Sequence, residues 1–318
     1  MTGAETRIPR MNRQQQAPST VQAGAAPEQS APLAILPLAS WAPPLRDEHA
    51  QDALEHGQVL WFPRLAFSLH DSERRFLTPD CADGQAKNIS FDPATKALQG
   101  TALAGSDRAE LAAMLARYAS QARGLVEILC PGYAAHLQQG RTSYRPVEIE
   151  GRQGSYKKDD TRLHVDAFAS RPNHGWRILR IFSNINPHGG ARVWHVGEPF
   201  EDFAEKFYRR APPQFPGSAW LLERLGVTKG RRSRYDHVML ALHDRAKADQ
   251  HYQQSAARTR IEFPPGSTWM VFTDRVLHAA LSGQYVLEQT LHLPPAAMRL
   301  PGLAPLRILE RLMQRHMA

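Results

Sequence analysis

The spacing of apolar residues along the chain predicts two helical stretches followed by a long series of short strands. Residues 46–57 and 106–129 carry apolar side chains at helical spacing. Further along, short runs rich in β-branched and aromatic residues alternate with turn signals, which is typical of strands. The predicted strands cover residues 58–67, 142–150, 161–168, 176–185, 191–196, 258–263, 267–272 and 285–293.

Helical spacing returns twice among and after these strands. Residues 200–250 predict a helical insert, and residues 303–317 predict a C-terminal amphipathic helix. Several strands of mixed spacing with helical cover favour an α+β fold with a β-sandwich or jelly-roll core. Residues 1–32 are rich in Gln, Ala, Pro and Ser, which predicts a disordered N-terminal arm. We therefore expect a single folded domain over residues 33–318.

One predicted strand places reactive side chains at alternate positions. In "TRLHVDAFAS" (161–170), apolar residues occupy one face, so His164 and Asp166 share the opposite face. Residues two apart in a strand are separated by roughly 6.6 Å, which allows an imidazole and a carboxylate to converge on one metal ion. A second imidazole would complete a ligand set that suits non-haem ferrous iron.

Several histidines compete to be the third ligand. Five are less suitable, because they lie in the predicted insert and are expected to face solvent, or follow the next strand too closely: His237, His243, His251, His188 and His195. His278 fits better, since it lies between one predicted strand and a Ser-Gly-Gln turn into another. Two imidazoles and a carboxylate also bind zinc, but the chain contains no HExxH motif, so a zinc hydrolase ranks last.

The order of these motifs resembles that of the Fe(II)/2-oxoglutarate dioxygenases. After the HxD strand comes "LRIFSNINPHGGARVW", and "PPGSTWMVFTDRVLHAALSGQ" then carries the distal histidine. Within that superfamily, residues 164–203 are similar to the Kdo hydroxylases, and the similarity extends from about residue 40 to the C-terminus.

This resemblance implies a double-stranded β-helix (jelly-roll) core with N-terminal helices and a helical insert. It implies that His164, Asp166 and His278 bind Fe(II). It further implies that the chain uses 2-oxoglutarate and O2 to convert the Kdo sugar of Kdo-lipid A into its 3-hydroxylated form, Ko.

The far carboxylate of 2-oxoglutarate needs a cation, best supplied by the forked guanidinium of an arginine. Many relatives place this arginine nine to eleven positions after the distal histidine, but residues 287–289 are Leu, Glu and Gln here. The strand after HxD offers Arg180, favoured as pointing inward, with Arg177 on the opposite face as the fallback. Thr161 and Asn184 are further candidates for contact with the co-substrate.

Charge adds an expectation about the substrate. Lys and Arg exceed Asp and Glu by 39 − 31 = 8, which fits nucleic acid, an anionic lipid or an acidic small molecule. No nucleic-acid-binding motif is recognisable, so no nucleic-acid partner is expected. Kdo is acidic, so basic residues near the proposed mouth are candidate substrate contacts, with a solvated surface as the alternative: Lys157, Lys158, Arg162, Arg171 and Arg192. Candidate aromatic walls are Phe168, Trp176 and Trp194.

Composition also bears on location. The chain has only two cysteines and no recognisable signal peptide or transmembrane run, so we expect a reducing, cytoplasmic location. The helix at 303–317 sets leucines opposite arginines, which would allow peripheral contact with the bacterial inner membrane. Docking of this helix on its own core or on a dimer partner is the alternative, and the oligomeric state stays open.

Two other functions remain open at this point. The same iron centre could act on a protein or a small molecule, or the jelly roll could bind a sugar or a metal without catalysis. Formation of succinate from 2-oxoglutarate separates a catalyst from a binding protein.

Overall fold

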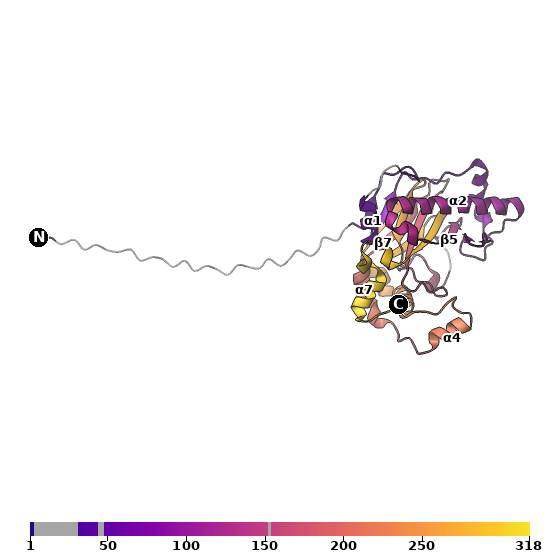
Figure 1. The fold of residues 1–318 in the computed structure, drawn as a ribbon. Coiled ribbons are helices and arrows are strands. Elements are labelled where there is room, and N and C mark those ends of the chain that lie inside the picture. The colour runs from indigo at the N-terminus through magenta and orange to yellow at the C-terminus, as the bar shows by residue number, and fades with distance from the viewer. Residues whose placement is uncertain (3–30, 44–47, 152–153) are drawn as a thin grey trace. The chain divides into compact units, whose positions relative to one another are not determined.

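Eleven strands and seven α-helices make up the described part of the chain, residues 1–2, 31–43, 48–151 and 154–318 of a computed structural model (Figure 1). The strands are β1 Leu33–Ile35, β2 Val59–Phe62, β3 Ile89–Phe91, β4 Leu98–Gln99, β5 Gln138–Arg145, β6 Arg177–Asn184, β7 Arg192–Gly197, β8 Arg258–Phe263, β9 Thr268–Phe272, β10 His278–Ser282 and β11 Val286–Leu293. The α-helices are α1 Glu48–Glu55, α2 Gly105–Leu129, α3 Phe200–Phe207, α4 Ser218–Arg224, α5 Arg234–Ala248, α6 Gln250–Ser255 and α7 Pro305–Met313.

Short 3-10 helices occupy several connections: η1 Asp71–Phe76, η2 Pro79–Cys81, η3 Pro131–His136, η4 Tyr156–Lys158, η5 Tyr208–Arg210, η6 Pro295–Ala297 and η7 Pro301–Leu303. The chain divides into a unit Met1–Ser30 and a unit Ala31–Ala318, and all these elements belong to the second. Most of the predicted N-terminal arm lies outside the described residues.

The larger sheet has eight strands in the order β1-β2-β9-β6-β11-β5-β3-β4. Only the edge pair β1–β2 is parallel, and the other pairs are antiparallel. Strands β6 and β11 pair along their whole length, from Arg177 opposite Leu293 to Asn184 opposite Val286. The fold is thus a mixed α/β arrangement built on a large antiparallel sheet.

The smaller sheet has three antiparallel strands in the order β10-β7-β8. Its β7 and β8 pack on the large sheet through aromatic rings. Trp194 on β7 lies 5.0 Å from Phe182 and 5.7 Å from Trp269, both on the large sheet, and Phe263 on β8 stacks on Trp269 at 4.1 Å, as measured between ring centroids. This cluster defines the inner face of the large sheet.

Helices α1 and α2 cover the outer face of the large sheet (Figure 1). Leu125 and Val126 of α2 belong to the same buried cluster as Leu179 and Ile181 of β6. Because side chains alternate along a strand, burial of Leu179 and Ile181 on the outer face directs Arg180 to the inner face.

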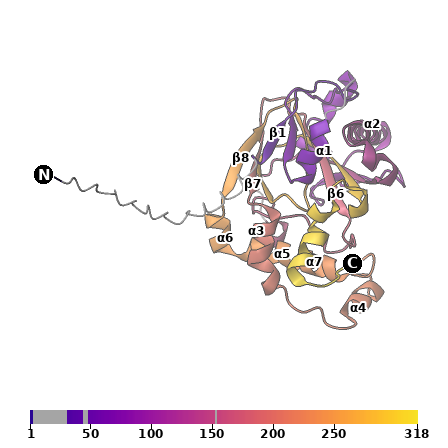
Figure 2. The same ribbon diagram turned by 60° about the vertical axis from the view of Figure 1, so that its left-hand side comes forward.

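Helices α3, α5 and α6, between β7 and β8, form a second layer together with α7 (Figure 2). On α7, the apolar residues Leu306, Ile308 and Leu309 are buried in one cluster with residues of α3 and α5. The sequence left three placements open for this helix: the membrane, its own core and a dimer partner. Its apolar face packs on its own core. Across the described segments, every helix falls short of the length or the hydropathy that a membrane crossing requires.

Three predicted strands differ from the observed ones. The strand predicted at 58–67 is limited to β2, Val59–Phe62, which ends before Pro63. The strand predicted at 142–150 is shifted to β5 and ends before Pro146, which has no N–H to continue the ladder. The run 161–168 forms only an isolated antiparallel bridge, at His164. Its partner strand β10, with the sequence HAALS, was not predicted, because it is short and lacks a strand-like pattern.

Candidate metal centre

His164 and His278 lie opposite each other although they come from distant parts of the chain. The backbone N–H of each donates to the carbonyl oxygen of the other, over 3.0 and 2.9 Å. Directly opposed residues of an antiparallel pair project their side chains to the same side. The two imidazoles are therefore neighbours, with their ring centroids 4.6 Å apart.

The backbone also sets the tautomer of both rings. His164 Nδ1 lies 2.7 Å from the carbonyl oxygen of Arg162, and His278 Nδ1 lies 2.9 Å from that of Val276. Because a carbonyl can only accept, each Nδ1 carries the proton and donates it. Both Nε2 lone pairs are left available to a metal, and the backbone partners orient the rings for it.

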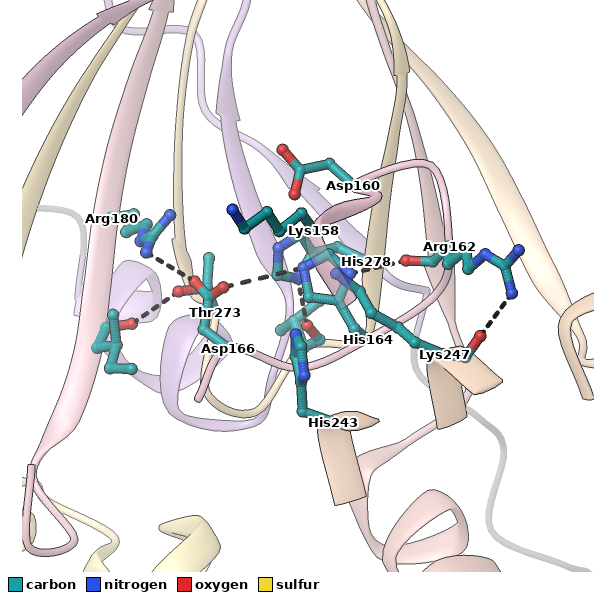
Figure 3. Close-up of polar contacts among 12 residues, drawn as sticks. Lys158, Asp160, Arg162, His164, Asp166, Arg180, His243, Lys247, Thr273 and His278 are labelled. Atoms are coloured by element: carbon teal, nitrogen blue, oxygen red, sulfur yellow. Dashed lines mark hydrogen bonds and ion pairs between the residues drawn. The ribbon is translucent and has the colours of Figure 1, made fainter. Parts of the chain in front are cut away.

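Asp166 brings a carboxylate to the same place (Figure 3). Its Oδ1 lies 3.9 Å from His164 Nε2, and the ligand atoms of the three residues all lie within 4.8 Å of one another. The N–H of Asp166 donates to the carbonyl of Thr273 over 2.8 Å, which fastens the HxD segment to the residues preceding His278. The structure thus brings together the three residues that the sequence singled out as metal ligands.

Burial determines the protonation of this triad. It lowers the pKa of His164 well below the ordinary value, with repulsion from His278 as a further cause, and it lowers the pKa of His278. Burial raises the pKa of Asp166, but the Arg180 guanidinium holds it below its usual range. At neutral pH the site therefore presents two neutral imidazoles and one carboxylate, a set that suits non-haem ferrous iron.

Arg180 projects from the inner face of β6, as strand alternation predicted. Its guanidinium joins Asp166 Oδ2 over 3.1 Å and Glu288 Oε1 over 3.0 Å. On the other side of Glu288, Arg145 Nε lies 3.0 Å from Oε2. The Nε of Arg180 is buried without a hydrogen-bond partner among the described residues. Arg180 therefore holds the Asp166 carboxylate in place and keeps one donor for a ligand.

The fallback assignment of Arg177 to the co-substrate is wrong. Arg177 is fully buried, its Nε lies 2.6 Å from Asp274 Oδ2, and its guanidinium lies 3.8 Å from the centre of the Phe272 ring. Strand alternation places it on the face of β6 opposite Arg180, under the helical cover. Arg177 is thus part of a buried ion pair that stabilises the fold.

Asn184 and Thr161 also have other roles than the predicted ones. The Asn184 amide donates to the carbonyls of Gly190 and Phe263, over 3.0 and 2.9 Å, and so holds the turn after β6. Thr161 is exposed, and its hydroxyl donates to Asp159 Oδ1 over 2.6 Å. These local hydrogen bonds correct both predictions, because they occupy the groups that would have bound the co-substrate.

Arg192 lies inside the fold. The sequence analysis had instead placed it at the mouth of the proposed site. It is buried, and its Nη1 donates to the carbonyl of Gly283 over 2.7 Å. Its Nε has no hydrogen-bond partner in the described part of the chain. Burial, together with repulsion from Arg145, lowers the pKa of Arg192 to about 9. A buried guanidinium that the protein compensates only in part indicates a site for an anion.

Trp194, two residues after Arg192 on β7, adds a third unsatisfied donor. Its ring stacks on His278 with 5.0 Å between the centroids. Its Nε1 is buried, and no described residue accepts a hydrogen bond from it. Arg192 and Trp194 are two apart on β7 and therefore share a face. The donors Arg180 Nε, Arg192 Nε and Trp194 Nε1 are the kind of groups that an acidic co-substrate requires near the metal.

His243 lies at the metal centre, although the sequence analysis expected it to face solvent. Its ring centroid is 5.4 Å from that of His164, and its side chain is only 12% exposed (Figure 3). One turn later on α5, Lys247 is buried and donates to the carbonyl of Lys157 over 3.1 Å. The spacing of four residues could have shown that both share a helix face, but not that this face covers the site.

A cleft of about 610 Å³ opens over the inner face of the large sheet. Strands β5, β6 and β11 and the loop that follows the HxD motif line it, and Phe168 and Trp176 belong to this lining, as the sequence predicted. Arg180 also lines the cleft, and because it pairs with Asp166, the cleft lies next to the triad. The lining has more arginines than acidic residues: Arg141, Arg145, Arg171 and Arg180 against Asp92 and Glu288. Such a cleft suits an anionic ligand.

The family model of 3-deoxy-D-manno-oct-2-ulosonic acid (Kdo) hydroxylase matches residues 40–316. The chain belongs to the Kdo hydroxylase family. Among curated protein sequences, none matches this chain.

Solved structures of a Kdo hydroxylase, KdoO, described as a non-heme Fe(II) alphaketoglutarate dependent dioxygenase, resemble the chain over most of its length. The complex with cobalt(II) is 45% identical, with a TM-score of 0.88, and the match covers 90% of this chain and 97% of that one. The complex with alphaketoglutarate and Fe(III) is 44% identical, with a TM-score of 0.87, and the match covers 91% and 98% of the two chains. The complex with succinate and Fe(III) is 44% identical, with a TM-score of 0.87, and the match covers 90% of this chain and 97% of that one.

The remaining basic residues can be placed within this Kdo hydroxylase fold. Arg171 is exposed and lines the cleft, while Lys158 is exposed at the end of η4. Lys157 forms an ion pair of 2.8 Å with an aspartate of α5. Arg162 pairs with an aspartate over 3.1 Å and donates to a carbonyl of α5 over 2.7 Å. Arg162 is therefore a structural contact, which corrects its assignment to the substrate.

Proposed function

We propose that this chain hydroxylates the Kdo sugar of Kdo-lipid A to Ko, with Fe(II), 2-oxoglutarate and O2. One observation carries the proposal: two imidazoles with free Nε2 atoms and one carboxylate lie beside a basic cleft, in a member of the Kdo hydroxylase family. In this proposal the two packed sheets are the double-stranded β-helix, or jelly roll, that holds the centre.

His164, Asp166 and His278 would hold the ferrous ion. The donor set fits, because both imidazoles are neutral and the carboxylate is ionised at neutral pH, and both Nδ1–H groups already donate to carbonyls. Iron bound there supplies the activation of O2, coupled to the oxidative decarboxylation of 2-oxoglutarate to succinate and CO2. The protein orients the ligands, and Arg180 keeps Asp166 ionised.

We assign 2-oxoglutarate to the donors next to His278. Arg192 and Trp194 present buried N–H groups that lack partners among the described residues, and the Nε of Arg180 does the same. A dicarboxylate would satisfy these donors and compensate the buried charge of Arg192. Binding of 2-oxoglutarate, predicted for Arg180 alone, is thus assigned to three donors on the two sheets.

We assign the acidic sugar to the cleft. Arg171 and Arg141 present guanidinium groups on the cleft lining, and such groups bind carboxylates and phosphates through paired hydrogen bonds. Phe168 and Trp176 provide apolar surface for the sugar ring. An open basic cleft of this kind accepts a head group and leaves acyl chains outside the protein.

We also propose that the enzyme works at the cytoplasmic face of the bacterial inner membrane. The proposed substrate is a membrane lipid, and the buried, unpaired state of Cys81 and Cys130 is compatible with a reducing compartment. The contact with the membrane is not made by the apolar face of α7, because that face is buried.

Mass spectrometry tests this function. Kdo-lipid A incubated with the enzyme, Fe(II), 2-oxoglutarate and air should gain one oxygen on the sugar, with one succinate formed per product. The Asp166→Ala variant should give neither product. If the wild type releases succinate only with a peptide or another small molecule, the substrate assignment is wrong. If the wild type forms no succinate under any condition, the chain is better interpreted as a binding protein.

A further inference from the structure

The segment from the end of η5 to the first residue of α5, residues 211–234, exposes an unusual number of large apolar side chains. Five of them are at least half exposed: Phe215 at 72%, Trp220 at 55%, Leu221 at 50%, Leu225 at 66% and Val227 at 53%. In the rest of the described chain only four large apolar residues are exposed: Met1, Ile35, Tyr156 and Leu300. Soluble surfaces normally scatter such residues singly, so a cluster of five indicates an interaction surface.

This apolar cluster contains α4, a helix in which Ser218, Ala219 and Leu222 are partly buried and the other residues are exposed. None of its seven residues, all of them described, is buried. Figures 1 and 2 show α4 at the margin of the folded unit, away from both sheets. So short a helix is not stable in water by itself, because helices of this length depend on burial of one face. A surface that covers α4 would supply this burial.

Charge identifies the kind of surface. Residues 211–234 contain one acidic residue, Glu223, and five basic ones: Arg224, Lys229, Arg231, Arg232 and Arg234. A tryptophan and leucines among arginines and lysines are typical of segments that lie in the interface of an anionic bilayer. The apolar side chains enter the boundary of the acyl chains, and the basic ones contact the lipid phosphates.

The same segment is attached to the wall of the cleft. The N–H of Lys229 donates to the carbonyl of Ser170 over 2.8 Å, and the Arg232 guanidinium donates to the carbonyl of Ala169. On either side of these two acceptors, Phe168 and Arg171 line the cleft. A bilayer that covers residues 211–234 would therefore lie beside the cleft entrance.

We propose that residues 211–234 are a membrane-docking element for an anionic bilayer. It inserts Phe215, Trp220, Leu221 and Leu225 into the lipid interface beside the cleft. The sugar head group of a membrane lipid then reaches the cleft while its acyl chains stay in the bilayer. The proposal rests on the proposed function in taking a membrane lipid as substrate, and it names the surface through which that substrate is approached.

Co-sedimentation with vesicles that contain no Kdo-lipid tests the docking separately from the activity. The full chain should bind vesicles of phosphatidylcholine with phosphatidylglycerol, and bind phosphatidylcholine alone much more weakly. The double variant Trp220→Ser, Leu225→Ser should lower binding by about tenfold or more. Ile35→Ser is the matched control, because Ile35 is an apolar side chain 59% exposed on β1. The control should bind like the wild type.

Tryptophan fluorescence reports whether the segment itself enters the lipid. All six tryptophans lie in the described residues, and only Trp220 among them is exposed. Lipids brominated on the acyl chain should therefore quench the wild type on binding. Trp220→Phe keeps an apolar aromatic ring, so it should still bind the vesicles but lose most of this quenching.

Several outcomes would overturn the proposal. The wild type could fail to bind anionic vesicles, or the double variant could bind them as well as the wild type does. If the wild type instead forms a dimer that the double variant abolishes, and shows no vesicle binding, the segment contacts a second copy of this chain. Unchanged quenching in Trp220→Phe would place the contact elsewhere.

Activity assays separate this failure from failure of the proposed function. The double variant should hydroxylate Kdo-lipid A in detergent micelles at the wild-type rate, and in vesicles about tenfold more slowly. Equal rates in vesicles would contradict docking while leaving the hydroxylase function intact. A wild type that binds vesicles but never modifies Kdo-lipid A would contradict the function and leave docking supported.

Discussion

Replacing Arg192 by methionine should raise the concentration of 2-oxoglutarate that half-saturates the enzyme. Arg192 is buried, its Nε has no partner among the described residues, and its Nη1 donates to the carbonyl of Gly283. Burial and Arg145 lower its pKa to about 9, so the fold alone does not fully compensate its charge. Methionine keeps a long apolar stem in the same space and removes the charge and the donors.

The expected magnitude follows from the lost contact. A hydrogen bond to a charged group contributes about 1.5–3 kcal/mol, and about 1.4 kcal/mol corresponds to a tenfold change in affinity. The KM for 2-oxoglutarate should therefore rise about 10- to 150-fold. The fold should tolerate the change, because the variant removes a buried charge whose pKa lies below its ordinary value and which therefore costs stability at neutral pH.

The lowered pKa also predicts a pH dependence of co-substrate binding. As the pH rises through about 9, Arg192 in the free enzyme loses its proton, and the site loses a positive charge. Binding of the 2-oxoglutarate dianion should then weaken, by up to about tenfold per pH unit above that value. The Arg192→Met variant should lack this dependence, because it has no proton to lose there.

Succinate formation at varied 2-oxoglutarate and saturating iron and sugar measures the effect, and calorimetric titration of the co-substrate measures binding directly. Arg260→Met is the control, since Arg260 lies on the neighbouring β8, is exposed, and pairs with Glu262 over 2.8 Å. An unchanged KM in Arg192→Met, with cobalt(II) absorption showing an intact metal site, would refute the assignment of Arg192 and return the role to Arg180.

Three further predictions concern the triad and the buried pair. His278→Ala should abolish turnover and lower the metal content after dialysis without a loss of helical circular dichroism; turnover near the wild-type rate would remove His278 from the ligand set. Arg177→Met should lower the free energy of unfolding in urea by about 3–5 kcal/mol, because it leaves Asp274 buried without its partner, and an altered KM for 2-oxoglutarate would contradict its structural role. The Tm of the metal-free protein should fall as the pH drops below about 6.5, because the histidines of the unfolded chain then bind protons that buried His164 and His278 exclude. His278→Gln should reduce this dependence of Tm on pH. A Tm insensitive to pH would contradict the lowered pKa values.

Strand alternation accounts for the parts of the site that the sequence predicted correctly. It placed His164 and Asp166 on one face, and it separated Arg180 from Arg177 before any contact was known. Both results depend only on the period of two in an extended chain, which holds in any tertiary setting. The alternation of side chains also held in the segment around His164, which pairs with the rest of the fold through a single isolated bridge.

Contacts between distant elements account for the parts that it missed. His243 was expected in solvent because helical spacing shows which residues share a face but not what covers that face. Asn184 was assigned to the co-substrate, yet the carbonyls that accept from its amide belong to a turn and to β8. The unsatisfied donor of Arg192 can be recognised only when every neighbour is known.

The amino-acid sequence by itself determined most of the local structure, the three candidate metal ligands and the family, because these depend on short-range periodicity and on the order of motifs. The tertiary structure alone decided which arginines lack partners, which helix covers the triad, and that α4 rather than α7 leaves its apolar side chains exposed. The physical reason is that burial and hydrogen-bond satisfaction are properties of a residue's surroundings, and those surroundings are assembled from segments far apart in the chain.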